Sequence, residues 1–459
     1  MKKHVLRTLA VAIAILSPLT PTITAKAIEK PENIDYLELS AGATINGDSD
    51  TPLWMWINQN GRIHPNSDTQ YLRLRTGKLA DQNKQLDWVY GIDVTGRHGD
   101  SDTDLLWTDL YAGLSTKQFS LTIGKKAKFF GLADSLLTAG PEVYSRNAPT
   151  IPKIALATNG YVNITDRLAF NAYLAHGWMG EEQYQKNAFL HQKHLYLRYG
   201  SNDPDRGFNI FAGMQHFAVW GGTDRVTGEH QPSGLSDFFR IFAGKSGGKD
   251  AQSTDKHNAL GNHLGSFDFG LQLKGQSRDW LFYAQTMFED GSGLRFYRPG
   301  DYLIGASMVN KQENDIIRRL NVEYFDTRSN AYKDNIDNYF SNSLYRSGWS
   351  YKGFAIGHPF IRFIAGPDYR YSPQNKIRSV NASALMEFSK LVNPLLRFAY
   401  IENHGSFYKP LSKSEQHNIY AVDVTNTSEL SDGWSFSQII SWDNDNHFGA
   451  GMTVSKKIF

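Results

Sequence analysis

The sequence predicts an all-β fold: a transmembrane antiparallel β-barrel of about 18 strands, with short helical and loop insertions closing the lumen. Three observations lead to this prediction. Apolar and polar residues alternate with a period of two in segment after segment, and these segments are both numerous and long. An export signal precedes them, and no apolar stretch of about eighteen residues, the length of a membrane helix, follows it.

The export signal occupies residues 1–27. A basic start is followed by an apolar run and then by Ala25-Lys26-Ala27, the small-x-small pattern of a cleavage site. An amino-terminal membrane anchor is the alternative, but Ser17, Pro18 and Pro21 interrupt the apolar run. We therefore expect export, cleavage near Ala27 and residence in the outer membrane.

The alternation is clearest in LDWVYGIDV at 86–94 and SFDFGLQLKG at 266–275, and WSFSQIISW at 434–442 repeats it. Successive side chains of a strand point to opposite faces, so each segment has one apolar and one polar face. A large soluble sandwich or propeller would also alternate, and this alternative stays open, although no repeat of propeller length is visible. Aromatic residues recur near segment ends, where a membrane barrel has its girdles: Trp88, Trp107, Trp280, Trp434, Trp442 and Phe448.

Counting the alternating segments gives about eighteen strands, a number typical of a closed barrel. Three longer interruptions divide the barrel of residues 28–459, at 128–166, 218–263 and 327–352. The tight connections at 114–119 and 275–279 do not fall on one side of this count, so the mouth that each insertion covers stays open. The counted strands start near 36, 70, 86, 104, 117, 167, 191, 207, 264, 278, 302, 316, 353, 376, 393, 415, 432 and 447.

The second insertion contains LSDFFRIFAG at 235–244, where the apolar spacing and a cap at Ser236 predict a short helix. We expect its apolar residues Phe238, Phe239, Ile241 and Phe242 to pack as a closure of the lumen. DSLLTAG at 134–140 is a weaker candidate for a helix.

Composition limits the function classes. The chain has 48 Lys and Arg against 46 Asp and Glu, and removal of the signal leaves a slight acidic excess, so a nucleic-acid partner is not expected. No cysteine is present, so packing and hydrogen bonds must hold the fold. His257 and His263 could ligate a metal, although loop hydrogen bonding is the commoner role. The acidic clusters NGDSDT, GDSDTD and SWDNDN lack the spacing of a calcium loop and read as solvated turns.

Four motifs in order carry a family resemblance: GLADSLLTAGPEVYSRNAPTIPKI, LSDFFRIFAGKSGG, NALGNHLGSFDFGLQ and GWSYKGFAIGHP. Together they resemble the capsule assembly family of outer-membrane proteins typified by Wzi, especially members from the Bacteroidetes. The resemblance implies an eighteen-stranded barrel that acts as a surface lectin and holds capsular or related polysaccharide on the cell. It covers most of the mature chain, but it transfers no binding residues.

The stretch DNYFSNSLYRSGWSYKGFAIGHP at 337–359 is the candidate binding surface, because it combines aromatic rings with small polar residues. Trp349 and Tyr351 are two residues apart and would share a face suited to stacking on a sugar ring. The alternative is that both belong to a membrane girdle. The same stretch supplies three further candidate binding residues, Asp337, Tyr345 and Arg346. The first insertion offers a second candidate site, formed by Tyr144, Arg146 and Asn147.

Three functions stay open: a polysaccharide-binding barrel, a porin or sugar channel, and an outer-membrane hydrolase. The hydrolase is the weakest, because the candidate acid, base and nucleophile groups are scattered through the sequence with no readable relation, so we expect no enzyme activity, cofactor or metal. Expected partners are polysaccharide, outer-membrane lipid and, from the terminal Phe459, the barrel insertion machinery. We expect a monomer.

The mature protein should begin at or close to Ile28. Amino-terminal sequencing of protein from washed outer membranes tests this, and carbonate washing should leave the protein in the membrane. A mature form that retains residues 1–27, or recovery in the soluble periplasm, would contradict the prediction.

Overall fold

The computed structural model describes residues 33–47, 50–99, 103–249, 251–252, 255–256, 259–289, 300–329, 331–332, 335–336, 338–445 and 447–459. The expected signal at 1–27 lies outside these residues. Among the described residues, no helix combines the length and apolar character that crossing a membrane requires.

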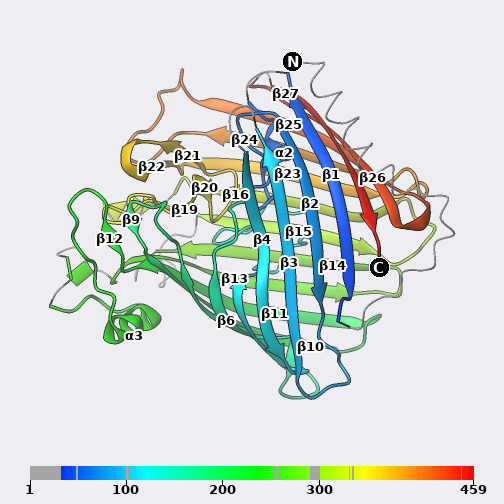
Figure 1. Cartoon of the computed structure of the whole chain (residues 1–459), viewed down its shortest axis with the longest axis horizontal. Helices are drawn as coiled ribbons and strands as arrows, with labels where there is room; N and C mark the ends of the chain where they lie inside the picture. The colour runs from blue at the N-terminus through cyan, green and yellow to red at the C-terminus, as the bar shows by residue number, and fades with distance from the viewer. Residues whose placement is uncertain are drawn as a thin grey trace.

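A closed antiparallel barrel forms the body of the molecule (Figure 1). The main sheet has 19 strands, of which β7 (Val162–Asn163) is two residues long and pairs only with β8; the other eighteen form the ring. β1 closes the ring by pairing with β27, with Ala41 opposite Val454. The ring strands are β1 (Tyr36–Asn46), β2 (Thr69–Lys78), β3 (Asp87–His98), β4 (Thr103–Ser115), β5 (Phe119–Lys125), β6 (Lys153–Thr158), β8 (Leu168–Trp178), β10 (Phe189–Gly200), β11 (Gly207–Trp220), β13 (Asn262–Lys274), β14 (Arg278–Phe288), β15 (Tyr302–Asn310), β16 (Ile317–Asp326), β23 (Ile377–Met386), β24 (Pro394–Asn403), β25 (His417–Glu429), β26 (Trp434–Asp443) and β27 (His447–Lys457).

The expected alternation separates an inner from an outer wall. Along β10, Leu195 and Leu197 are exposed on the outside, whereas His194 and Tyr196 are buried toward the lumen. The same division holds in β13, where Phe269 is exposed and Asp268 is fully buried. An apolar exterior around a polar interior is the arrangement of a barrel that has lipid outside.

All the long connections leave the same end of the barrel, which we call the loop end; β1 begins and β27 ends at the other, the turn end. Connections such as 116–118, 275–277 and 430–433 occupy the turn end, whereas 47–68, 126–152, 221–261 and 327–376 occupy the loop end. The two tight connections that the sequence count placed on different sides therefore share one side. The count overlooked β6, which lies inside the expected insertion 128–166, and this omission reversed the side of each connection from there to the extra strand counted near 353.

The loop-end connections contain small elements of their own, and those labelled β9, β12, β19 to β22 and α3 gather on the left of Figure 1. The strand expected to start near 353 is a short hairpin of β19 and β20 and not part of the ring. The expected helix at 134–140 is a turn. The small elements are α2 (Leu53–Trp56), α3 (Leu235–Ala243), β9 (Gln185–Lys186) with β12 (Thr223–Asp224), β17 (Ala331–Tyr332) with β18 (Asn335–Ile336), β19 (Ser350–Tyr351) with β20 (Phe354–Ala355), and β21 (Arg362–Ala365) with β22 (Tyr371–Gln374).

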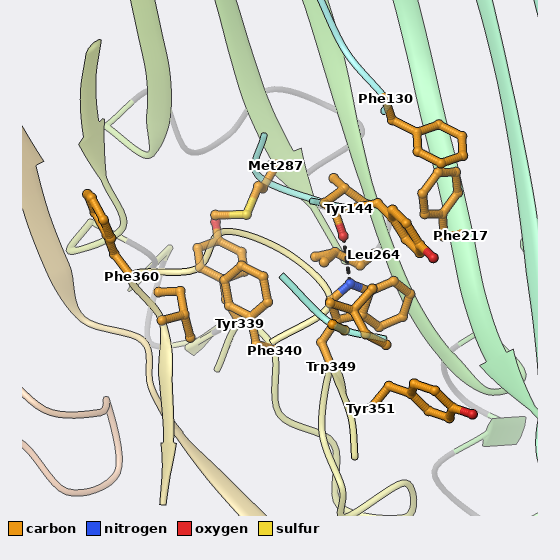
Figure 2. Packing of buried hydrophobic residues seen from close by; sticks show 14 of the residues in the cluster. Phe130, Tyr144, Phe217, Leu264, Met287, Tyr339, Phe340, Trp349, Tyr351 and Phe360 are labelled. Carbon is orange, nitrogen blue, oxygen red and sulfur yellow. Dashed lines mark hydrogen bonds between the residues drawn. The ribbon is translucent and has the colours of Figure 1, made fainter. Parts of the chain in front are cut away.

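Loop-end segments fold into the lumen and fill it, as Figure 2 shows. Phe130 of the first insertion packs edge-on against Phe217 and Tyr173 of the inner wall, with ring centroids 5.1 and 5.2 Å away. The third insertion extends over the whole β16–β23 connection, 327–376, and its His358 stacks on Phe325 of β16 at 4.1 Å. We call segments 126–152 and 338–361, which pack on each other and on the inner wall, the plug.

Buried polar side chains of the wall hold the plug by hydrogen bonds. Glu323 accepts bonds from the Thr138 hydroxyl at 2.6 Å and the Ala139 N–H at 2.9 Å. The Gln285 side-chain carbonyl accepts from the Glu142 N–H at 3.2 Å. The sequence prediction that insertions close the lumen is confirmed for these segments.

The expected closure by residues 235–244 is wrong, because α3 lies on the outer wall. Phe238 contacts His191 and Trp220, and both side chains point away from the lumen. In Figure 1, α3 stands at the lower left, beyond the barrel strands. The helix begins after Gly234, whose N–H donates to Asp237 at 3.0 Å, rather than after a Ser236 cap. The apolar residues of 235–244 do form a packing face, as predicted, but this face packs on the outer wall of the barrel and not in the lumen.

The plug should keep the unmodified protein closed to ions in a planar bilayer. Replacing residues 130–150 by a short Gly-Ser linker removes the packing on Phe217 and the bonds to Glu323, and a stable single-channel conductance should appear. Deleting 234–248 is the matched control: because α3 lies outside the lumen, this deletion should leave conductance low. A large steady current through the unmodified protein would contradict the prediction.

Candidate functional site

A pocket of about 590 Å³ opens at the loop end, between the β1–β2 connection and the third insertion. Its volume falls within the range of about 300–1,000 Å³ that is usual for ligand sites. Four aromatic rings, several amide and hydroxyl groups and two basic side chains line it. The lining residues are Asp50, Thr51, Trp56, His64, Pro65, Asn66, Ser67, Asn147, Lys352, Gly353, Phe354, Ala355, Ile361, Arg362, Phe363, Ala365 and Tyr371.

Helix α2 positions Trp56 at one wall of the pocket. The first N–H of this single turn, from Leu53, donates to Asp443 Oδ2 at 3.1 Å, which fixes the helix to the barrel wall. Trp54 anchors the turn in the core, edge-on to Phe360 with centroids 6.0 Å apart. Trp56 is left half-buried at the pocket, with its ring 6.2 Å from that of Phe354.

The hairpin of β19 and β20 supplies the opposite wall. Tyr351 pairs with Phe354 across a two-residue turn, Lys352-Gly353, in which both residues have positive φ, 53° and 81°. A turn with positive φ at both central positions matches the twist of its strands, and glycine at the second favours it. The turn exposes the Lys352 ammonium group at the mouth and sets Phe354 beside Trp56.

Arg362 and Phe363 of β21 and Tyr371 of β22 complete the lining, held in register by the pairs Arg362–Gln374 and Ala365–Tyr371. All three side chains are half-buried. The Tyr371 N–H donates to the Arg346 carbonyl at 2.9 Å, which ties this hairpin to the third insertion.

Asn147 gives the pocket a buried amide. Its Nδ2 donates to the Ala355 carbonyl at 3.3 Å, and the residue is 1% exposed. Its Oδ1 accepts no hydrogen bond from the described residues. A buried acceptor without a partner costs about 1–3 kcal/mol, and a bound hydroxyl or water would remove this cost.

The two basic side chains at the mouth have acidic neighbours that offset their charge only in part. Lys352 pairs with Glu182 at 2.8 Å and Arg362 with Asp445 at 3.6 Å. Both basic groups are more than a third exposed, so each pair contributes little to stability and can rearrange when an anion approaches.

Most of the rings predicted to bind are core residues instead. Trp349 is fully buried and donates its indole N–H to the Val143 carbonyl at 2.7 Å (Figure 2). Tyr351, Tyr345 and Tyr144 are between 3 and 7% exposed and belong to the same cluster. Burial raises the pKa of Tyr351 to about 12, with a smaller effect from Glu182. The hypothesis that Trp349 and Tyr351 form an open stacking face therefore does not fit their burial, and neither ring is a girdle residue.

The remaining candidates lie in three places. Asn147 lines the pocket, as described. Arg146 is bonded within the first insertion, to the Ser135 carbonyl, and Asp337 lies outside the described residues. Arg346 is exposed and belongs to a neighbouring basic-aromatic cluster, with its guanidinium 5.2 Å from the Tyr184 ring.

Arg370 contacts Tyr184 from 5.1 Å, and Arg225 lies 4.3 Å from the exposed Tyr369 ring. These residues extend the positive surface of the third insertion beyond the pocket.

The metal hypothesis at His257 and His263 has no support in the described residues, where no group of three or more His, Cys, Asp or Glu side chains could hold a metal. His263 instead bonds to His216, with Nδ1 and Nε2 2.8 Å apart. His257 lies outside the described part of the chain.

Residues 43–378 match the model of the family described as capsule assembly protein Wzi. The chain belongs to this family. None of the curated proteins has a sequence that matches this chain. Among solved structures, Escherichia coli Wzi, described as an outer-membrane carbohydrate-binding β-barrel involved in group 1 capsule assembly, is 13% identical, with a TM-score of 0.62 over 91% of this chain and 83% of that one.

Pseudomonas aeruginosa OpdH is 10% identical, with a TM-score of 0.48 over 93% of this chain and 97% of that one. The likeness to Wzi shows that this chain shares the fold of an outer-membrane barrel, and family membership agrees with the resemblance in the sequence.

Replacing Trp349 by alanine should destabilise the folded protein by about 3–5 kcal/mol, because a large buried ring and its hydrogen bond to Val143 are both lost. The temperature at which heat-modifiable gel mobility is lost should fall. Trp178→Ala, on the exposed outer end of β8, is the control and should change it little. Unchanged stability of Trp349→Ala would show that the ring is not part of the core.

Proposed function

We propose that this protein binds capsular or related surface polysaccharide at the outer face of the cell, and that the pocket beside α2 is the binding site. The observation that carries the proposal is the lining of the pocket: half-buried rings, a buried amide oxygen without a partner and two basic groups at the mouth. Family membership and the carbohydrate binding ascribed to Escherichia coli Wzi support the ligand class.

Each kind of lining residue matches one feature of a sugar. The faces of Trp56 and Phe354 can pack on the apolar C–H face of a pyranose ring, worth about 0.5–1.5 kcal/mol per ring by analogy with aromatic pairs. The Asn147 amide oxygen can accept a bond from a hydroxyl at the base of the pocket. The openness of the mouth suits a polymer, of which the pocket would hold one portion while the chain continues over the surface.

The charges favour an acidic polymer. Lys352 and Arg362 stand at the mouth, and the positive surface continues through Arg346 and Arg370 of the third insertion to Arg225 of the second. A carboxylate on the sugar could replace the partly exposed Glu182 or Asp445 as the partner of a basic group. Such contacts depend on salt, because exposed charges are screened within about 8–10 Å at physiological ionic strength.

The orientation follows from the lengths of the connections. Outer-membrane barrels have short periplasmic turns and longer extracellular loops, so the loop end faces outward and the pocket faces the capsule. We further propose cleavage of the signal near Ala27, a monomeric barrel surrounded by lipid, assembly by the barrel insertion machinery and no catalytic activity.

A porin or sugar channel remains the alternative function. The plug argues against it, because Phe130, Trp349 and their neighbours fill the lumen on the loop-end side. No specific observation favours the hydrolase.

Trp56→Ala and Phe354→Ala should each weaken binding of the recognised polymer, found on an array of purified bacterial surface polysaccharides, by about 2- to 12-fold. Arg362→Gln and Lys352→Gln should weaken binding of acidic polymers only, and more at low salt than at high salt. Trp178→Ala, on the outer wall, is the matched control and should bind normally. Normal binding by a folded Trp56→Ala, Phe354→Ala double variant would exclude this pocket as the site.

A further inference from the structure

On four neighbouring strands of the barrel, the outward-facing residues change from apolar to polar near the loop end. On β8, β10, β11 and β13, exposed apolar residues such as Leu174, Leu195, Ile210 and Phe269 cover the outer wall. Toward the loop end, the same rows continue with histidines. These are His176, His191, His216 and His263, one on each strand.

The histidines form a connected polar band across the four strands. His191 stands directly opposite His176, and the rings of His216 and His263 stack at 5.0 Å. Lys193, in the same outward row of β10, adds a charge. Such a band would be costly to leave against lipid, because polar and charged groups on the outer face of a membrane barrel are destabilising.

Helix α3 covers this band. Phe238 lies edge-on to His176 and His191, with ring centroids 5.9 and 5.5 Å away. Phe242 contacts His191 at 5.6 Å, and the Lys193 ammonium group donates to the Phe242 carbonyl at the end of the helix. Ile241, another residue of α3, is fully buried. One face of α3 therefore shields the part of the band formed by His176, His191 and Lys193.

A second face of α3 is apolar and exposed. Leu235, Phe239 and Phe242 are spaced i, i+4, i+7, which places them on one side of the helix, and they are 75, 61 and 41% exposed. Ser236 and Arg240 lie on a third, polar side. A helix with one face on the barrel, one apolar face and one polar face has the character of a helix that lies along a membrane surface.

We infer that α3 is a membrane-interface helix, whose Leu235, Phe239 and Phe242 enter the outer edge of the lipid layer and complete the apolar belt of the barrel over the histidine band. The occupant of this face is bilayer lipid. Two observations favour lipid: the exposed rows of the barrel wall run directly to the helix, and Trp178, an exposed ring at the loop end of β8, marks the level at which membrane barrels place interfacial aromatics.

The inference is independent of sugar binding, because α3 lies on the outer wall and contributes no residue to the pocket. It also explains why a segment inserted at the loop end carries large rings at its surface. An exposed stripe of this kind would be unfavourable in water but is favourable in the apolar part of a membrane.

Fluorescent labelling tests the inference directly, because the chain has no cysteine and single-cysteine variants take one label. Phe239→Cys, Ser236→Cys and Leu195→Cys are labelled with an environment-sensitive dye and placed in phosphatidylcholine vesicles. The label at 239 should be quenched by spin-labelled lipid and protected from aqueous iodide, as at 195 on the outer wall. The label at 236 should show the opposite pattern.

Leu235→Cys provides a second lipid-facing reporter whose side chain is too exposed to affect folding, and heat-modifiable gel mobility verifies each variant. If the labels at 235 and 239 respond to iodide as the label at 236 does, the face is in water and the inference is wrong. If instead both labels are shielded from lipid and iodide alike, and unlabelled Phe239→Cys protein forms disulfides between copies under an added oxidant, a second copy covers the face and the lipid assignment is overturned.

Discussion

The hydrogen bonding of Glu323 is the interaction on which the closed form of this barrel depends. The carboxylate is 1% exposed, on the inner wall of β16. It accepts bonds from Thr138 and Ala139 of the plug, and from Tyr283 of β14 and Asn381 of β23. A buried carboxylate requires several donors, and here the plug supplies two of them. Without the plug, the Glu323 carboxylate would lose two of its hydrogen-bond donors. The polar inner wall and the plug therefore stabilise each other. The packing of Phe130 and Trp349 adds apolar burial to a position that hydrogen bonds have already fixed.

Much of the barrel could be predicted from the sequence, because strand alternation is a local property. The strand β6 was missed for a local reason too: it has only six residues, and its inward positions are the small Ala155 and Ala157, which do not give a strong alternation with Ile154 and Leu156. The segment from Gly353 looked like a wall strand because its residues are apolar, but it turns back on itself at Lys352-Gly353. The two errors cancelled in the strand number while reversing the sides of the connections between them. A correct number of strands is therefore weaker evidence for such a prediction than a consistent placement of all short turns at one end of the barrel.

The candidate site was only partly accessible to sequence reasoning. The stretch 337–359 does line the pocket, but through Lys352, Gly353, Phe354 and Ala355, and Asn147 joins it from the first insertion. Trp349 was the more conspicuous residue, and its role was not readable, because its partner Val143 is 206 residues away. Trp56 was missed altogether, since nothing local connects the β1–β2 connection with the third insertion. Aromatic content indicates that a segment is important, but long-range contacts decide which rings are buried and which remain open to a ligand.

Each insertion at the loop end has side chains suited to the wall of the barrel, inner or outer, on which it packs. The first and third insertions meet a polar inner wall, and they bring backbone donors and rings that satisfy its carboxylates and fill its volume. The second insertion meets the outer wall, where the histidine band must be separated from lipid, and it brings a helix with apolar residues on two faces. The pocket forms where the third insertion, already fixed by its buried rings, reaches the β1–β2 connection at the mouth. A rigid core directly beneath an open aromatic pocket reduces the entropy that the protein loses on binding, which would favour the proposed binding of a flexible polymer.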